Sequence, residues 1–211
     1  MSRSLKRVVL VLEALDREYP GAGSTLEYVN PFQLLVATIL AAQCTDARVN
    51  IVTKEIFRKY PDPKSFAGAD LGELMEDIKS TGFYRNKAKN IKASSRLIYE
   101  EYGGVVPNSM DELISLPGVA RKTANIVLTS GFGKVEGIAI DTHAKRLSYR
   151  LGWTCENDPV KIEQGLMNLV PRKWWGEVNH ILVAHGRAVC KARKPDCGGC
   201  VVEKFCPKAG L

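Results

Sequence analysis

Residues 116–124 read LPGVARKTA, and this stretch decides how the middle of the 211-residue chain folds. Pro117 and Gly118 break a helix, because proline has no backbone N–H to donate and glycine readily adopts the positive φ of a tight turn. A capping-box pattern at residues 109–112 opens a short helix before them, and helical character resumes just after them. The stretch therefore predicts two short helices joined by a tight glycine turn.

A turn of this kind can bind phosphate, since backbone N–H groups at the turn and at the start of the next helix hold an anion without reading a base. We expect phosphate contacts from the turn residues Pro117, Gly118, Val119, Ala120 and Arg121. Lys122 lies in the first turn of the second helix, where the helix dipole disfavours a cation and favours the neutral amine of a nucleophile. A lysine beside such a turn is more commonly a phosphate contact, so this motif by itself leaves both roles open.

The rest of the chain has the composition of a soluble globular protein, with 45% hydrophobic and 25% charged residues. No segment approaches the roughly 18 uninterrupted apolar residues of a membrane span. The apolar run Val8–Leu12 follows basic residues, as in a signal peptide, but Glu13 and Asp16 interrupt it and no small-residue cleavage site follows. We therefore expect a cytoplasmic protein with no membrane partner.

Apolar residues recur with helical period along nearly the whole chain, and no segment alternates convincingly as a strand would. Capping residues and prolines mark where the helices start. The predicted helices begin at about Leu5, at Asn30-Pro31, at Asp46, after Gly82, at Arg121, at Asp141 and at Asp158-Pro159. We predict an all-α fold with short connections between its helices.

Basic residues outnumber acidic ones by 30 to 23, which gives a net charge of +7. The excess is uneven, because residues 171–211 hold eight basic side chains against three acidic ones. A second basic cluster consists of Arg85, Lys87, Lys89, Lys92 and Arg96. A solvated face explains either patch alone, but two patches flanking a candidate site favour a nucleic acid as the partner.

Four of the six cysteines lie close together near the C-terminal end, with spacings x6, x2 and x5. They are Cys190, Cys197, Cys200 and Cys206. Four thiolates this close can surround one metal centre, whereas a secreted disulfide scaffold spreads its cysteines along the chain. A compact run that closes with Cys-Pro favours a 4Fe–4S cluster, with zinc as the alternative. The loop between the first two ligands carries Lys191, Arg193 and Lys194, which we expect to contact DNA phosphates.

Asp141 follows the apolar segment 138–140 and precedes Thr142 and His143. Aspartate is one of the preferred N-cap residues of helices, so a cap is the simplest role for this side chain. A catalytic carboxylate is the alternative role, and the residues around Asp141 leave it open. His143 is expected to be structural.

Three motifs, in this order and spacing, make the chain similar over nearly its whole length to the endonuclease III family, DNA glycosylases with a helix-hairpin-helix. These motifs are LPGVARKTA at residues 116–124, IDTH at residues 140–143 and the C-x6-C-x2-C-x5-C pattern at residues 190–206. The resemblance implies that Lys122 is the catalytic nucleophile and that Asp141 is the catalytic carboxylate.

The resemblance also implies how the chain is divided. A six-helix barrel with the hairpin is expected at residues 25–135, and an iron–sulfur domain is expected from residues 1–24 together with 136–211. The partner is then double-stranded DNA that holds a damaged pyrimidine or an abasic site. We expect a monomer that is associated with the nucleoid of a prokaryote.

Two further residues take their expected roles from the resemblance. Gln43 stands at the position of the residue that, in this family, fills the gap left in the duplex by a flipped nucleotide. Phe83 stands at the position of the family's wedge, the side chain that inserts into the duplex and unstacks a base step. The wedge is commonly leucine, and phenylalanine would stack more strongly; a place for Phe83 in the hydrophobic core is the alternative. The hairpin departs from the family at Ala120, which replaces a glycine and fits if the backbone there is already helical.

The predicted activity is that of a bifunctional DNA glycosylase and apurinic/apyrimidinic lyase that removes oxidised pyrimidines in base excision repair. In this reaction Lys122 forms a Schiff base with the sugar, and β-elimination nicks the strand. One alternative is a monofunctional glycosylase for adenine or mismatched thymine, although those relatives lack a lysine at the position of Lys122. The other alternative is a DNA-binding or redox protein that uses the hairpin and the cluster without catalysis.

Overall fold

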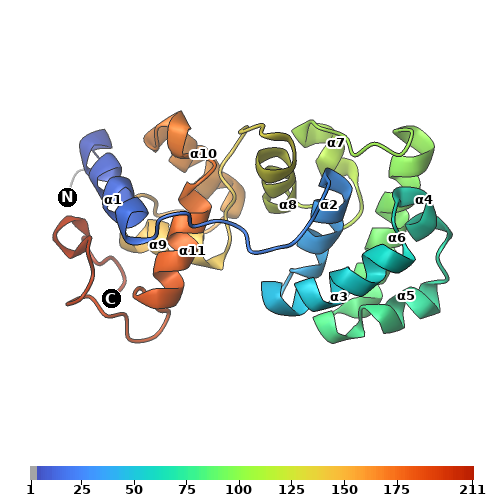
Figure 1. Cartoon of the computed structure of the whole chain (residues 1–211). Coiled ribbons are helices and arrows are strands. Elements are labelled where there is room, and N and C mark those ends of the chain that lie inside the picture. Colours follow the sequence, from blue (N-terminus) through green and yellow to red (C-terminus); the bar gives the residue numbers. More distant parts are fainter. Residues whose placement is uncertain (1–3) are drawn as a thin grey trace. The chain divides into compact units, whose positions relative to one another are not determined.

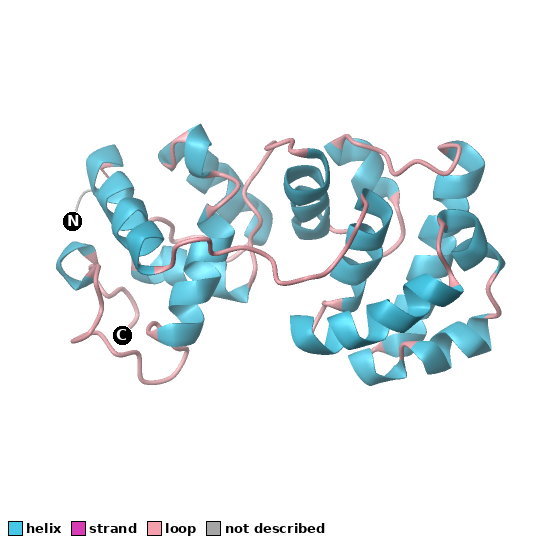
Figure 2. Cartoon of the chain, in the orientation of Figure 1, coloured by secondary structure: helices cyan, strands magenta, loops and turns pink. Residues whose placement is uncertain are grey.

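The computed structural model describes residues 4–211, and these residues form helices, turns and loops but no strand (Figure 2). The α-helices are α1 (Leu5–Glu18), α2 (Pro31–Leu40), α3 (Asp46–Lys59), α4 (Pro63–Gly68), α5 (Leu71–Asp77), α6 (Tyr84–Glu101), α7 (Met110–Ser115), α8 (Arg121–Ile126), α9 (Thr142–Arg150), α10 (Pro159–Leu169) and α11 (Val178–Ala188). Shorter helical turns are η1 (Lys79–Thr81), η2 (Val127–Gly131), η3 (Arg172–Trp174) and η4 (Glu203–Phe205). The predicted all-α fold is confirmed.

Side-chain caps explain why several helices begin where the sequence predicts. Asn30 accepts a hydrogen bond from the backbone of Gln33 at 2.9 Å and so caps α2. Ser109 caps α7 in the same way, but the Glu112 carboxylate accepts from the Ser109 hydroxyl rather than from its backbone N–H. The predicted capping box at residues 109–112 is therefore only half formed. The sequence analysis gives no start for α4, α5 or α11.

The chain folds into two compact units. The hairpin unit is Thr25–Glu136, and the cysteine unit consists of the chain up to Ser24 together with Gly137–Leu211. The expected domains divide the chain at residues 135 and 136, one residue earlier than the observed units. Residues 1–3 of the expected iron–sulfur domain lie outside the described residues.

The core of the hairpin unit surrounds α2, a helix that is apolar on all sides. Leu34, Leu35 and Leu40 of α2 are almost completely buried, and burying each such side chain contributes roughly 1.5–3 kcal/mol. Phe66 of α4 packs edge-on against Phe32 of α2, with their ring centres 5.6 Å apart. The helix α6 lies against α4 and α5 and forms the other wall of this core.

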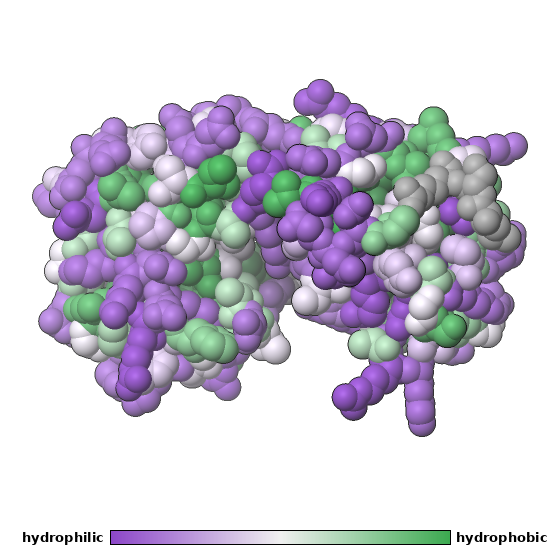
Figure 3. Space-filling model, turned by 180° about the vertical axis from the view of Figure 1, so that it is seen from behind, coloured by the Kyte–Doolittle hydropathy of each residue, from purple (hydrophilic) through white to green (hydrophobic). Residues whose placement is uncertain are grey.

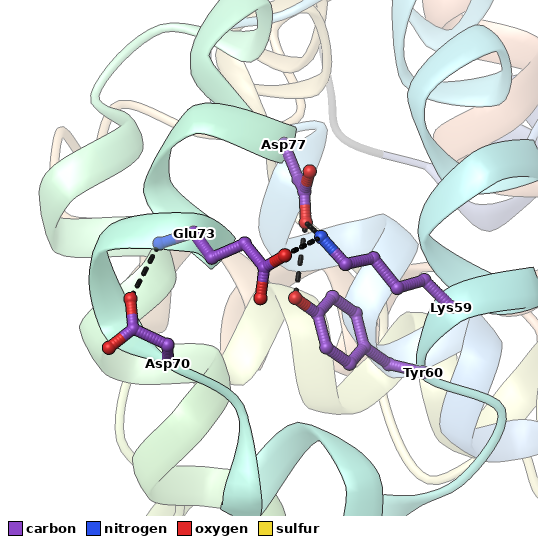
Figure 4. A network of polar contacts seen from close by, with 5 residues as sticks. All are labelled: Lys59, Tyr60, Asp70, Glu73 and Asp77. Carbon is purple, nitrogen blue, oxygen red and sulfur yellow. Dashed lines mark hydrogen bonds and ion pairs between the residues drawn. The ribbon is translucent and has the colours of Figure 1, made fainter.

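An ionic network on the surface of the same unit fixes the end of α3 to α5 (Figure 4). The Lys59 ammonium lies 2.7 Å from a carboxylate oxygen of Asp77 and 2.8 Å from one of Glu73, and the Tyr60 hydroxyl donates to Asp77 at 3.1 Å. These partners raise the pKa of Lys59. Exposed pairs of this kind add little stability, but they fix α5 directly before η1, the turn that leads to Phe83.

The cysteine unit brings the two ends of the chain together. The apolar face of α1 includes Val8, Leu12 and Leu15, which are buried, and α1 packs beside α11 although the two helices are far apart in sequence (Figure 1). The helices α9 and α11 approach closely at Gly186, where an added Cβ would lie 2.5 Å from Nδ1 of His143. This contact gives His143 a structural position between the two helices.

The exposed face in Figure 3 is mainly hydrophilic, with hydrophobic side chains in scattered patches. Among residues 4–211, no helix combines the length and the apolar character needed to cross a membrane.

Candidate functional site

The glycine turn between α7 and α8 is packed against α6. The Ser94 hydroxyl of α6 donates to the carbonyl oxygen of Pro117 at 2.6 Å, and Val119 is buried. Gly118 has φ +80°, and an added Cβ would lie only 2.7 Å from the side-chain nitrogen of Asn90. This position therefore requires glycine both for its backbone conformation and for its close contact with α6.

Ala120 is the N-cap of α8, with an extended backbone (φ −88°, ψ 166°). The backbone of Ala120 is therefore not yet helical, and alanine fits for a different reason than the one considered from the sequence: φ is negative there. An alanine cap offers no side-chain oxygen to the first-turn N–H groups of α8, which Ser, Thr, Asn or Asp would provide. A phosphate oxygen can take that role at the surface.

Lys122 is exposed in the first turn of α8, and α8 continues directly into the π-helical turn η2. π-Helical turns are rare and occur frequently at functional sites. The sequence analysis did not predict this turn, because helical character alone does not distinguish a π-helical turn from an α-helical one. The lysine itself stands where the sequence placed it, directly after the glycine turn.

Gln43 and Phe83 lie in two turns of the hairpin unit, and both have a left-handed backbone, with φ +54° and +48° respectively. This conformation is uncommon and strained for residues other than glycine. Gln43 is exposed, and Phe83 is 63% exposed. The alternative that places Phe83 in the hydrophobic core is therefore wrong.

The basic cluster on α6 is not the continuous surface patch that the sequence suggested. Arg85 and Lys89 are exposed, but Lys87 is buried and Lys92 is half-buried with its ammonium bonded to the carbonyl oxygen of Ala69. The helical period explains the difference, because residue 87 lies on the same face as the buried residues 88, 91 and 94.

The four clustered cysteines line one small cavity in the cysteine unit. Its walls also include the apolar side chains of Leu147, Leu151 and Val202. All four thiols are free of disulfide bonds, and burial raises the pKa of the Cys200 and Cys206 thiols. Among residues 4–211, no three His, Cys, Asp or Glu side chains converge on a position that could hold a single metal ion, and the cysteines instead surround the cavity. Four thiols around an apolar cavity fit a 4Fe–4S cluster, which takes one cysteine at each iron.

Two arginines of α9 hold the loop between the first two cysteines. The buried Arg150 donates to the carbonyl oxygens of Lys191 at 2.7 Å and Ala192 at 3.0 Å, and Arg146 donates to the carbonyl oxygen of Cys190 at 3.1 Å. With the loop backbone held in this way, the side chains that we expect to contact DNA, those of Lys191, Arg193 and Lys194, are exposed. The sequence analysis missed both arginines, although their spacing of four residues on one helix face is a usable signal.

A histidine that the sequence analysis also missed contacts the cysteines. His185 of α11 is 2% exposed; its Nδ1 lies 3.0 Å from the Tyr19 hydroxyl and its Nε2 lies 3.4 Å from the sulfur of Cys200. Burial lowers the pKa of His185 to about 4. The ring is therefore neutral at neutral pH, and a donating Tyr19 hydroxyl would place the ring proton on Nε2, facing the cysteine.

Asp141 is the N-cap of α9, because its Oδ1 accepts a hydrogen bond from the backbone N–H of Ala144 at 2.7 Å. The cap interpretation is thus confirmed. The cap bond is accepted by Oδ1 and not by the other carboxylate oxygen, Oδ2.

Comparison with known proteins agrees with these features. Residues 36–172 match the family model of HhH-GPD superfamily base excision DNA repair proteins, and residues 190–206 match that of the iron-sulfur binding domain of endonuclease III. The second match covers the four cysteines that line the cavity, so the predicted 4Fe–4S cluster is confirmed as the cofactor.

Individual relatives agree with the family matches. The chain is 53% identical to an endonuclease III of Synechocystis, covering 99% of this chain and 95% of that one. It is 48% identical to an endonuclease III of Bacillus subtilis, covering 96% and 93% of the two chains. A solved endonuclease III, trapped as a covalent intermediate with DNA, superposes with a TM-score of 0.92 at 41% identity, covering 97% and 96%. The chain belongs to the HhH-GPD superfamily of base excision DNA repair proteins and, within it, to the endonuclease III family.

Proposed function

We propose that this protein is a bifunctional DNA glycosylase and apurinic/apyrimidinic lyase that excises oxidised pyrimidines in base excision repair. The observation that carries the proposal is an exposed lysine, Lys122, in the first turn of the helix that follows the glycine turn. Membership of the endonuclease III family supports the same activity. The partner is DNA, and the proposed form is double-stranded DNA with a damaged pyrimidine or an abasic site.

Lys122 is the proposed nucleophile. Its neutral amine attacks C1′ of the damaged nucleotide, the bond from C1′ to the base breaks, and the base leaves with a proton. Opening of the sugar ring gives a Schiff base between Nζ and C1′. Loss of a proton from C2′ then expels the 3′ phosphate by β-elimination, which nicks the strand.

Asp141 is the proposed catalytic carboxylate. Its Oδ1 is occupied by the N-cap of α9, so we assign the second role to Oδ2. A carboxylate oxygen stabilises positive charge that develops on the sugar and assists the proton transfers. The cap serves this role, because it fixes the orientation of the carboxylate.

DNA is held by backbone and by basic side chains in the proposed complex. The glycine turn, from Pro117 to Arg121, contacts a phosphate and binds it through backbone N–H groups other than those of Pro117, which has none, and Val119, which donates to the carbonyl oxygen of Leu116. The exposed side chains of Lys191, Arg193 and Lys194 bind further phosphates. Gln43 occupies the gap left by the flipped nucleotide, and Phe83 unstacks the neighbouring base step.

The cysteine cavity holds the cluster through Cys190, Cys197, Cys200 and Cys206. When bound, the cluster supplies a cross-link that orders the basic loop between Cys190 and Cys197. Because protein fills all four ligand positions, we assign it a structural role and place no catalytic step there. We further propose that the protein acts as a monomer associated with the nucleoid.

Reduction by borohydride tests this function. On a duplex with an oxidised pyrimidine, the wild-type protein should form a stable covalent adduct with DNA, whereas Lys122→Gln should lose the adduct and base release but still bind DNA. An undiminished adduct in Lys122→Gln would end the assignment of the nucleophile. Base release without a nick would indicate a monofunctional enzyme, and DNA binding without either reaction would indicate a binding protein.

A further inference from the structure

Lys87 of α6 is buried at a position where an apolar side chain would fill the core without the cost of burying a charge. The side chain is 5% exposed, and its ammonium donates to the carbonyl oxygens of Leu40 and Thr81, both at 2.8 Å. Within residues 4–211 it has no carboxylate partner. Burying an ammonium group is costly, and burial lowers the pKa of Lys87. The presence of a lysine at this buried position therefore needs an explanation beyond the filling of the core.

The two carbonyl groups end two different helical segments. Leu40 is the last residue of α2, and Thr81 is the last residue of η1. Carbonyl groups at the end of a helix lack partners within it, and a cation there is favoured by the helix dipole. One ammonium group thus caps two helical ends that are about 40 residues apart in the chain.

Each of these ends leads directly into a turn with a left-handed residue. Gln43 follows Leu40 by three residues and has φ +54°, and Phe83 follows Thr81 by two residues and has φ +48°. The backbone N–H of Lys87 also donates to the carbonyl oxygen of Phe83 at 3.1 Å. Lys87 therefore bonds to the chain on both sides of Gly82, where the Phe83 turn forms.

Strained backbone of this kind persists only where its surroundings hold it in place. The residues with the left-handed backbone, Gln43 and Phe83, expose their side chains to solvent. Packing of those side chains therefore does not hold the turns in place. The hydrogen bonds of Lys87 fix the chain immediately before each turn, from within the core. One side chain thus bonds to the segments that precede both turns.

We propose that Lys87 is a positioning residue that joins the Gln43 turn and the Phe83 turn, so that both side chains enter the DNA duplex as one preorganised unit. The inference rests on the proposed roles of Gln43 and Phe83 in nucleotide flipping. The ammonium of Lys87 touches neither the DNA nor the reacting atoms; it acts through the two turns that it holds.

The substitution Lys87→Met tests the coupling, because methionine keeps the apolar stem and removes the donors. Hydrogen exchange should rise at least tenfold in both turns, at residues 41–45 and at residues 82–86. Lys92→Met is the matched control, because Lys92 lies on the same helix and donates to Ala69, away from both turns. Faster exchange in only one turn, or in neither, would overturn the coupling.

A second readout separates positioning from general stability. We expect kcat/KM of Lys87→Met on an abasic site in a duplex to fall about 10- to 100-fold relative to the same site in single-stranded DNA. Lys92→Met should keep the wild-type ratio, and Lys87→Arg, which keeps donors, should restore part of it. Equal losses on both substrates would overturn the positioning role.

Two outcomes keep this test distinct from that of the proposed function. If the wild-type protein cleaves neither substrate, the proposed function fails, while the exchange experiment still decides whether Lys87 couples the turns. If Lys87→Met does not fold, Lys87→Gln takes its place, because it shortens the side chain and breaks at least one of the two bonds. Unchanged exchange in both turns of Lys87→Gln would then overturn the coupling.

Discussion

The guanidinium of Arg150 lies 3.3 Å from the sulfur of Cys190, while the same group holds the next two carbonyl groups of the loop. Arg150 is the last residue of α9, and Asp141 is the N-cap of the same helix. One helix of the cysteine unit therefore carries the proposed catalytic carboxylate at one end and the anchor of the cysteine loop at the other.

Removing the Arg150 side chain should lower both the stability of the protein and the amount of iron that the four cysteines retain. Arg150→Met leaves two loop carbonyls without their charged donor, and we expect the free energy of unfolding to fall by about 2–4 kcal/mol. Thermal denaturation and iron content measure the two effects. Arg172→Met, at an exposed position in the same unit, is the control; equal effects of both substitutions would contradict the anchoring role.

The basic loop should contribute to the salt dependence of DNA binding. Each phosphate contact releases counterions, so the slope of log K against log salt is negative. Lys191→Glu, Arg193→Glu or Lys194→Glu should make this slope shallower, by about 1 in magnitude. Titrations at several salt concentrations measure this slope. Lys161→Glu makes the same charge change on α10 and is the control. If the magnitude of the slope decreases as much in this variant as in the loop variants, the loop is not part of the interface.

The catalytic role of Asp141 should separate from its role as a helix cap. Asparagine caps a helix about as well as aspartate, so Asp141→Asn should keep the fold yet slow turnover by roughly 10²- to 10⁴-fold. Asp158 caps α10 through the same kind of bond, from Oδ1 to the N–H of Lys161 at 3.0 Å. Asp158→Asn should therefore leave turnover unchanged. An unchanged rate in Asp141→Asn would reduce Asp141 to a cap.

Phe83 should matter for activity and little for stability, because its ring is mostly exposed. Phe83→Ala should reduce cleavage of duplex lesions without a large loss of melting temperature. Phe83→Gly should be more stable than Phe83→Ala by about 1 kcal/mol, since glycine tolerates the left-handed backbone. Denaturation of both variants checks the order; a marked loss of melting temperature with normal activity would instead indicate a structural ring.

The four cysteines should hold iron and sulfide. Purified protein should be yellow-brown, with broad absorption near roughly 400 nm and about four iron atoms per chain. Metal analysis and an absorption spectrum check this directly. Colourless protein with one zinc ion per chain would show that the cavity holds a different centre.

Much of the fold could be predicted because its signals are local. The cap at Asn30 and the capping aspartates Asp141 and Asp158 act on backbone groups within three residues, so the sequence reveals them directly. The short helices α4 and α5 were missed, because segments of six or seven residues are too short to show a periodic apolar face.

The site was predicted less evenly. Lys122 and the four cysteines stand in motifs whose residues are close in sequence, and these motifs support the assignment of family and cofactor. Lys87 was mistaken for part of a surface patch, because charge alone does not tell which face of α6 meets the core. From the sequence, Phe83 could lie either at the DNA-facing surface or in the hydrophobic core, and the large exposed fraction of its side chain excludes the core.

The sequence by itself determined the helical class, the glycine turn, the cysteine spacing and the family, because each depends on neighbours within a few residues or on a short motif. Only the tertiary structure decided which charged side chains are buried and what they hold. The carbonyl of Leu40 is 47 residues from Lys87, and the sulfur of Cys190 is 40 residues from Arg150. Such contacts arise when helices pack, and no local pattern encodes which residue a buried cation will meet.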